Sequence, residues 1–220
     1  MMNKLMVLGL VFIVFLGFSA CKKAHLTANG NVVSEIRDVG QFTGLSSSGS
    51  TPVYVNYGSE YRVVVKGSSN IVPYFTTRVV DRKLQLIFEQ VSVHRDDIQV
   101  MITMPTIKDI ALSGSGKVEI RGGFPLLPTL NVSVSGSGDV EMQSEAEADE
   151  VGIDLSGSGK VDLEKLLIKH AKVDISGSGN TRLQVQDRLK ASISGSGKVY
   201  YRGNPIVQQD ISGSGRIIKF

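Results

Sequence analysis

The chain has 220 residues, 41% of them hydrophobic and 20% charged, with 24 Lys and Arg against 21 Asp and Glu, giving a formal net charge of +3. This nearly neutral balance, with the basic residues scattered along the chain, gives no sign of the concentrated basic face of a nucleic-acid-binding protein. The single cysteine excludes an intrachain disulfide, so packing alone must stabilise any domain of this chain.

The first twenty residues have the pattern of an export signal. Lys4 is followed by an uncharged stretch from Leu5 to Ala20, sixteen residues long, whereas a membrane-spanning helix needs roughly 20 apolar residues. The small residues before Cys21 make this segment similar to a bacterial lipoprotein signal, in which such a cysteine becomes the lipidated first residue of the mature chain. We therefore expect a signal peptide at residues 1–20, a lipid on Cys21, and an exported protein anchored in the cell envelope, at the outer membrane. The alternatives are a cleaved secretory peptide with an incidental thiol and a short N-terminal anchor.

Residues 21–31 are polar and contain glycine, which predicts a tether between the lipid and the fold. The segment 32–105 contains short runs rich in β-branched and apolar residues, separated by hinges at Gly58, Gly67 and Asp81. These runs predict strands at residues 53–55, 61–65, 84–88 and 98–102.

Internal repetition is the strongest signal from residue 106 onward. The tetrapeptide SGSG begins at six serines spaced 22, 21, 20, 18 and 18 residues apart, namely Ser113, Ser135, Ser156, Ser176, Ser194 and Ser212. Apolar and polar residues alternate strictly around each copy, which is the period of an extended strand. Ser48 lies 65 residues before Ser113, close to three such intervals, so we expect residues 32–105 to form less regular opening coils of one domain, 32–220, with regular coils over 106–220. A separate antiparallel cap is the alternative.

Aligning the copies on SGSG gives columns of equivalent positions. Three columns are expected to point inward, and they are almost purely aliphatic or β-branched: Val118, Val140, Val161, Thr181, Val199 and Ile217 after the motif, Leu112, Val134, Leu155, Ile175, Ile193 and Ile211 just before it, and Leu130, Val151, Ala171, Leu189 and Val207 further upstream. The serines of the motif are expected to point outward.

A repeat of about 20 residues is too short for two strands and a crossover helix, but it suffices for two or three short parallel strands joined by tight bends. Such coils stack about 4.8 Å apart and bury the inward columns in one continuous core. The repeat therefore predicts an all-β fold, a single-stranded parallel β-helix, or solenoid, with coils of 18–22 residues. An antiparallel meander or barrel is the competing fold.

The motif itself is interpreted as scaffold. At a bend of a narrow coil, an inward Cβ would collide with the opposite wall, and glycine both removes that atom and tolerates positive φ. The outward serines are expected to form ladders in which each hydroxyl donates a hydrogen bond to the next coil. The structural glycines are Gly114, Gly116, Gly136, Gly138, Gly157, Gly159, Gly177, Gly179, Gly195, Gly197, Gly213 and Gly215.

The chain resembles a known family over residues 36–220. The segments that carry the resemblance are FTGL at 42–45 with SGS at 48–50, VVVKG at 63–67 with NIVP at 70–73, LQL at 84–86, and Pro105 leading to the serial SGSG copies. Together they resemble the head GIN domain family of auto-transporter adhesins, which is common in secreted and lipidated proteins of Bacteroidetes-type bacteria. The resemblance implies a right-handed parallel β-helix on the cell envelope and brings no catalytic residues with it.

The sequence offers no pattern typical of catalysis, a metal site or a cofactor site. His25, His94 and His170 lie far apart, and none has a second ligand at metal-binding spacing. The serines occur in a strand context and not in the Gly-x-Ser-x-Gly elbow of a serine hydrolase. We therefore predict that the chain is not an enzyme.

Two columns of outward positions contain charged residues that could form a surface site or ion pairs. The column two residues before each motif contains Asp154 and Asp174 on adjacent coils, where like charges repel unless a cation bridges them or Lys160 and Lys172 balance them. This pair is the candidate surface site. The column directly after each motif begins Lys117, Asp139, Lys160, so we expect adjacent coils to pair charges there.

These features predict a non-catalytic binding or adhesion module that presents repetitive β-helix walls to an envelope glycan or protein ligand. A self-assembling envelope scaffold is the first alternative, and a calcium-assisted glycan-cleaving β-helix that uses Asp154 and Asp174 is the second. An uncovered last coil would be an open sheet edge. We therefore expect either that Phe220 folds over that end or that a second subunit covers it, giving a homo-oligomer.

Overall fold

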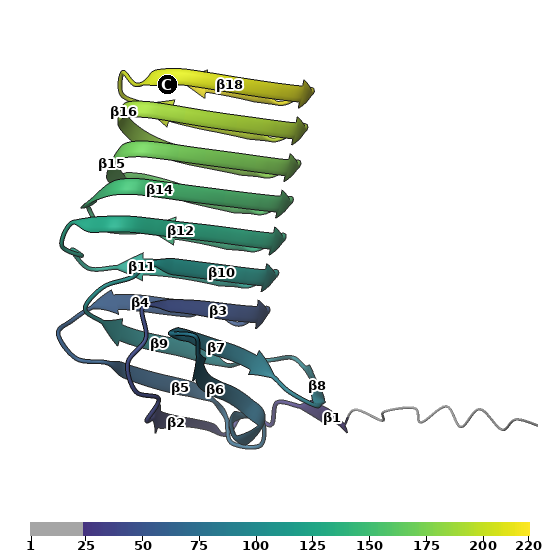
Figure 1. Ribbon diagram of the computed structural model, residues 1–220. Helices are drawn as coiled ribbons and strands as arrows, with labels where there is room; N and C mark the ends of the chain where they lie inside the picture. Colours follow the sequence, from purple (N-terminus) through teal and green to yellow (C-terminus); the bar gives the residue numbers. More distant parts are fainter. Residues whose placement is uncertain (1–23) are drawn as a thin grey trace, which may run out of the picture.

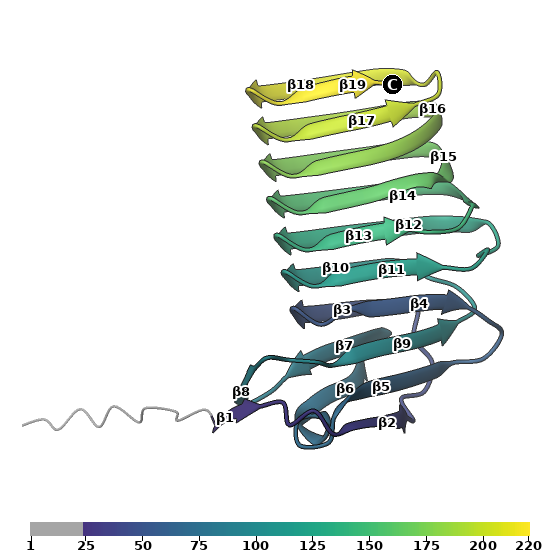
Figure 2. The ribbon, with the colours of Figure 1, turned by 180° about the vertical axis from the view of Figure 1, so that it is seen from behind.

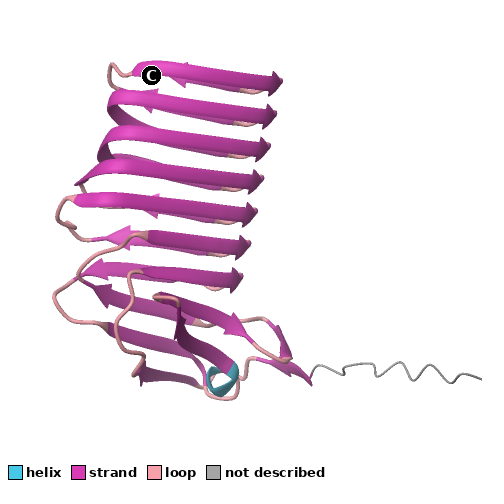
Figure 3. Ribbon diagram, viewed as in Figure 1, coloured by secondary structure: helices cyan, strands magenta, loops and turns pink. Residues whose placement is uncertain are grey.

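The computed structural model describes residues 24–220, so the expected signal peptide and Cys21 lie outside the described residues. The described chain is built almost wholly of β-strands, with one short 3₁₀-helix (Figure 3). The elements are β1 (Ala24–Thr27), β2 (Val32–Arg37), β3 (Gly44–Gly49), β4 (Val53–Tyr57), β5 (Arg62–Ser68), η1 (Val72–Tyr74), β6 (Phe75–Val80), β7 (Lys83–Phe88), β8 (Val91–His94), β9 (Gln99–Met104), β10 (Asp109–Gly114), β11 (Lys117–Arg121), β12 (Leu127–Gly136), β13 (Asp139–Met142), β14 (Ala146–Gly157), β15 (Lys160–Gly177), β16 (Asn180–Gly195), β17 (Lys198–Arg202), β18 (Ile206–Gly213) and β19 (Arg216–Lys219).

The strands β3 and β4, together with all strands from residue 109 onward, form a stack of flat coils with two walls. The front wall, seen in Figure 1, contains β3, β10, β12, β14, the second halves of β15 and β16, and β18. The back wall, seen in Figure 2, contains β4, β11, β13, the first residues of β15 and β16, β17 and β19. All neighbours within these walls pair in parallel, and the SGSG motifs align exactly in register, as in Ser135 with Ser156 and Gly136 with Gly157. The predicted parallel β-helix is confirmed, and no antiparallel meander or barrel forms in the described stack.

The core lies between the two walls and is formed by the inward columns. Val118, Val140, Val161, Thr181 and Val199 are fully buried, and the column before the motif is 1–3% exposed from Leu112 to Ile193. The last coil is the exception, since Ile211 is 37% exposed with no described coil stacked above it. The alternating pattern of the sequence therefore becomes one continuous hydrophobic core.

The SGSG motif is the corner where the chain passes from the front wall to the back wall. Each front strand ends at the first glycine, which has positive φ, and the back strand begins after the second glycine. The carbonyl oxygen of Gly136 accepts hydrogen bonds from the N–H groups of Ser158 (2.8 Å) and Gly159 (3.1 Å) in the next coil.

The two glycines of each motif are required for different reasons. A Cβ on Gly157 would lie closer than 3.0 Å to the carbonyl oxygen of Gly136, in a backbone conformation with φ of +120°. A Cβ on Gly179 would likewise lie closer than 3.0 Å to the carbonyl oxygen of Gly159, but φ is not positive there, and the Cβ would also lie within 3.0 Å of the side chain of Leu155 in the preceding coil. The missing atom at the second glycine therefore also makes room for that side chain. The steric conflict is thus with the coil below and not, as expected, with the opposite wall.

The opposite corner of the coil absorbs all variation in repeat length. Residues 122–126 connect β11 to β12 in a 22-residue repeat, and residues 143–145 connect β13 to β14. In β15 and β16 the chain passes this corner without a break in the strand. The SGSG corner is constant, while the other corner varies in length, and a connection of residues 203–205 returns between β17 and β18.

The segment 32–105 combines an irregular coil with an antiparallel cap. β7 and β9 pair in parallel with β3 and β4, and these in turn pair with β10 and β11. β2, β5 and β6 instead make antiparallel pairs at the N-terminal end of the stack. One hydrophobic cluster runs through both parts, so the cap is not a separate domain. The segment therefore contains both parallel coil strands and antiparallel cap strands.

The expected tether over residues 21–31 is wrong for the part that the structure describes. Ala24–Thr27 forms β1, which pairs in parallel with β8, and Leu26 packs against the core. Asn29 and Gly30 are held by hydrogen bonds to Asn70 and Ser68. The polar composition of this segment reflects an exposed edge and not a free linker. Among residues 24–220 there is no helix of the length and hydropathy needed to cross a membrane.

The glycine at the first position of the motif should be the most sensitive residue of the coil. We expect Gly157→Ala to lower the free energy of unfolding by about 2–4 kcal/mol, because it adds both a steric clash and backbone strain. Gly123→Ala, where nothing lies within 4 Å of the added Cβ and φ is not positive, should change it by less than about 1 kcal/mol. Equal effects in urea denaturation would contradict this account of the motif.

Thr181 is the one polar residue in its inward column, and its buried Oγ1 has no hydrogen-bond partner. Valine has nearly the same shape and occupies this position in the coils before and after, at Val161 and Val199. Thr181→Val should therefore raise the free energy of unfolding by about 1–2 kcal/mol. A destabilised variant in the same denaturation assay would show that the hydroxyl has an unrecognised partner.

Candidate functional site

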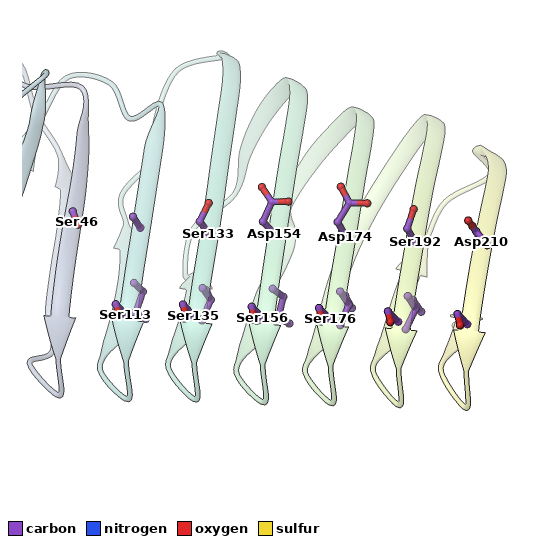
Figure 4. A pocket seen from close by; sticks show the side chains of 18 residues that line it. Ser46, Ser113, Ser133, Ser135, Asp154, Ser156, Asp174, Ser176, Ser192 and Asp210 are labelled. Carbon is purple, nitrogen blue, oxygen red and sulfur yellow. The ribbon is translucent and has the colours of Figure 1, made fainter.

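The front wall carries a long shallow groove between two rows of outward side chains (Figure 4). One row is Ser46, Ala111, Ser133, Asp154, Asp174, Ser192 and Asp210, and the other is formed by the first serines of the motifs, Ser113, Ser135, Ser156, Ser176, Ser194 and Ser212. The groove has a volume of about 580 Å³ and crosses the stack from β3 to β18. We call it the front groove.

Strand alternation produces the front groove. The residues between its two rows, such as Val134 and Leu155, point into the core and line the floor, so the groove surface is mainly apolar, while most of the rim side chains are small and polar. Identical register in every coil keeps each rim straight, as in the pairs Ser133 with Asp154 and Ser135 with Ser156. The groove is hollow because its rims contain only Ser, Ala and Asp.

The expected hydrogen-bonded serine ladders do not form. No side-chain hydrogen bond joins serines of successive coils anywhere in residues 24–220. Coils stack about 4.8 Å apart, whereas an O–H···O hydrogen bond spans about 2.5–3.0 Å, so short hydroxyl side chains in register do not reach one another. The rim hydroxyls therefore keep their hydrogen-bonding capacity for water or a ligand.

Asp154 and Asp174 lie directly opposite each other in the ladder, as predicted. Lys172 Nζ lies 2.6 Å from Asp174 Oδ2, and its hydrogen bond with Asp174 raises the pKa of Lys172. Lys160, the other expected partner, instead lies 2.9 Å from Asp162 on the back wall. The described residues contain no group of three His, Cys, Asp or Glu side chains placed to hold a metal ion.

The histidines do not converge on one site. His25 and His94 lie on the neighbouring strands β1 and β8, and His170 lies on the front wall. His170 Nδ1 is 3.6 Å from Glu150 Oε1. The carboxylate neighbours of His170 are therefore the surface side chains Glu150 and Asp187.

The back wall is covered by ion pairs, but they differ from the expected pairing along one column. Lys117 Nζ lies 2.9 Å from carboxylate oxygens of both Glu119 and Glu141, which belong to the neighbouring outward column. Arg121 also binds Glu119. Hydrogen bonds from Lys117 and Arg121 lower the pKa of Glu119, and the same bonding raises the pKa of Lys117. A lysine side chain is long enough to reach diagonally to the next coil, whereas the sequence analysis considered pairing only along one column.

The last three coils of the back wall carry a cluster that the sequence analysis missed. We define the basic-aromatic patch as Arg182, Lys198, Tyr200, Arg202, Arg216 and Phe220. The Arg182 guanidinium lies 5.5 Å from the ring centroids of both Tyr200 and Phe220, and the Arg202 guanidinium lies 5.0 Å from that of Phe220. The sequence could have indicated this patch. Arg216 is outward, and the alternation of strand residues makes Phe220, four residues later, outward as well.

Phe220 therefore does not fold over the end of the solenoid, as one expectation had it. Its N–H donates to the carbonyl oxygen of Tyr201, and its ring lies across the back wall against Tyr200. The strands β18 and β19 have one lateral neighbour each among the described residues.

A second hollow, of about 750 Å³, lies at the corner opposite the SGSG turns. It is lined by Glu141, Met142, Gln143, Glu145, Ala146, Glu147, Asp162, Glu164, Lys165, Leu167, Gln184 and Arg202. Within it, Lys165 Nζ donates to the carbonyl oxygen of Gln143 and Arg202 lies 2.8 Å from Glu164, whereas Glu145 and Glu147 have no ion pair within the described chain.

Comparison with known proteins identifies relatives of this architecture. Residues 41–205 match the family model described as "Putative auto-transporter adhesin, head GIN domain". A Bacteroides fragilis structure described as a "putative adhesin" has 19% identity and a TM-score of 0.68, covering 89% of this chain and 100% of its own. A "putative lipid binding protein" of Parabacteroides distasonis has 18% identity and a TM-score of 0.69, with coverage of 89% and 99%. At these identities the likeness to solved structures concerns the fold, and no curated protein matches the sequence.

The Glu119 cluster should make stability depend on pH. Because the folded-state pKa of Glu119 is below its ordinary value of 4.5, its contribution is fully present above pH 4.5 and is lost as pH falls through the lowered pKa. Glu119→Gln should cost about 0.5–1 kcal/mol at pH 7, with the difference from wild type vanishing in acid. Urea denaturation at a series of pH values measures this, and Glu145→Gln, an exposed site without an ion pair in the described chain, is the control. A difference that persists in strong acid would contradict the ion-pair explanation.

Proposed function

The chain belongs to the head GIN domain family, and on this premise we propose that it is a non-catalytic adhesion module of the cell envelope, anchored by a lipid on Cys21. The family is one of surface-associated adhesins, which supports export and binding. The lipid anchor rests on the sequence pattern before Cys21. The ligand surface proposed here is the front groove.

The observation that carries this proposal is the extent of the front groove. It crosses seven strands of the front wall in constant register, a length of about 30 Å at about 4.8 Å per coil. A pocket for a small molecule buries most of its ligand, whereas this groove is open, and its rim of motif serines repeats the same hydroxyl from coil to coil. Such a surface suits an extended polymer with repeating hydroxyl groups, and an envelope glycan has this chemistry.

The position of the chain start is consistent with display of the groove. β1, which begins three residues after Cys21 in the sequence, lies at the end of the stack opposite β18 (Figure 1). With a lipid on Cys21, the capped N-terminal end would lie nearest the membrane. The front groove would then run from the membrane side outward and remain open to a polymer along its length.

Bulky residues in the groove should abolish ligand binding without unfolding the coil. We expect Ser156→Arg and Ser176→Arg to weaken binding of residues 22–220, which contain every described strand, to isolated envelope fractions and arrayed glycans by at least about tenfold. Ser158→Arg and Ser178→Arg are matched controls, because these serines are equally exposed but lie in the turn, outside the groove.

The assay also separates the other functions considered for this chain. Binding that survives the groove variants would refute the front groove as the ligand surface. Release of unsaturated sugar ends that requires calcium and Asp154 would indicate a glycan-cleaving enzyme instead. Ordered self-assembly without any ligand would favour an envelope scaffold.

A further inference from the structure

The basic-aromatic patch differs in charge from the rest of the back wall. The back-wall residues of the last three coils are Asn180–Gln184, Lys198–Arg202 and Arg216–Lys219, and none of them is acidic. The outward positions of these coils include Arg182, Lys198, Arg202 and Arg216. The preceding coils of the same wall carry Asp139, Glu141, Asp162 and Glu164.

The positive charge of the patch is matched only in part within the described chain. Glu141 pairs with Lys117, Asp162 pairs with Lys160, and Glu164 pairs with Arg182 and Arg202. Lys198 and Arg216, by contrast, have no ion pair among residues 24–220, and they lie directly opposite each other in the ladder. Like charges opposed in a sheet are destabilising unless an anion lies between them.

The internal pairing also decides which kind of partner fits. A second copy of the chain would have to offer a free acidic surface to this patch. Four of the five back-wall carboxylates are already neutralised by lysine or arginine, and only Asp139 has no ion pair within the described chain. The unmatched charge of the wall is therefore positive, so a back-to-back contact with a second copy would bring like charges together, and the wall favours an anionic partner.

The aromatic rings add a second recognition element to these charges. Phe220 is 43% exposed, and its ring and that of Tyr200 lie between the arginine side chains. A guanidinium has five N–H donors, so Arg202 keeps donors free while it binds Glu164. Arginine beside exposed rings offers both bidentate anion binding and a flat apolar surface.

We propose that the basic-aromatic patch binds an anionic polysaccharide, independently of the front groove on the opposite wall. Carboxylate or phosphate groups of the polymer bind Lys198 and Arg216, and sugar rings lie against Tyr200 and Phe220. The choice of a polysaccharide over an anionic lipid surface rests on the proposed anchor, which places the patch at the end of the solenoid far from the membrane (Figure 2).

The test uses polygalacturonate as a carboxylated probe and dextran as a neutral one, with residues 22–220 at low ionic strength. Wild type is expected to bind polygalacturonate and not dextran, with affinity falling as salt is added. The double variant K198Q/R216Q should bind at least about fivefold more weakly. Its matched control is K172Q/K190Q, which removes two cations that also oppose each other on adjacent coils, but on the front wall.

Further arms separate the alternatives. Tyr200→Val should also weaken binding to polygalacturonate, because it removes a ring and leaves every charge in place. Equal losses in both double variants would show that only net charge matters and would overturn the proposal. So would tighter binding to phosphatidylglycerol vesicles than to the polysaccharide, or no binding at all. The variant Ser156→Arg should leave this binding unchanged, so failure of the front groove and failure of the patch are distinguishable.

Discussion

The structure depends on the contact between successive SGSG turns. At each corner the backbone of one coil lies directly on the backbone of the coil below, so closely that even a methyl group has no room at Gly157. The same contact supplies hydrogen bonds from Ser158 and Gly159 to the carbonyl oxygen of Gly136. Because this fit has one geometry, every coil is fixed in the same register, and the walls on either side inherit it.

Constant register converts a short sequence repeat into extended surfaces. On the front wall, it aligns small polar residues into a straight groove whose hydroxyls stay unpaired with one another. On the back wall, it places charged residues of adjacent coils within reach, so that Lys117 binds two carboxylates at once. The two walls share one core and one corner, yet they offer a ligand different chemistry: hydroxyls and carboxylates on one side, cations and rings on the other.

The regular coils were predictable from sequence, whereas the N-terminal cap was not. Alternation around SGSG identified the inward residues, because a period of two fixes which face each side chain takes. It also placed Asp154 opposite Asp174, as the ladder shows. The pairing of β2 with β5 joins residues about thirty apart by antiparallel contacts, which no local period encodes. The alternating pattern also gives no distances between side chains of adjacent coils. Such distances explain why the serine ladders do not form and why Lys160 pairs with Asp162 on the back wall.

The unequal corners of the coil bear on how such a molecule changes over evolutionary time. One corner has no room for a side chain at its two glycines, while the other accommodates the five-residue connection 122–126 as readily as an unbroken strand. A duplicated segment of one repeat would therefore insert as a whole coil, provided that it carried one intact SGSG, whatever the length of its far corner. Growth by tandem duplication would lengthen the solenoid and both of its walls in steps of one coil, without any change to the capped N-terminal end.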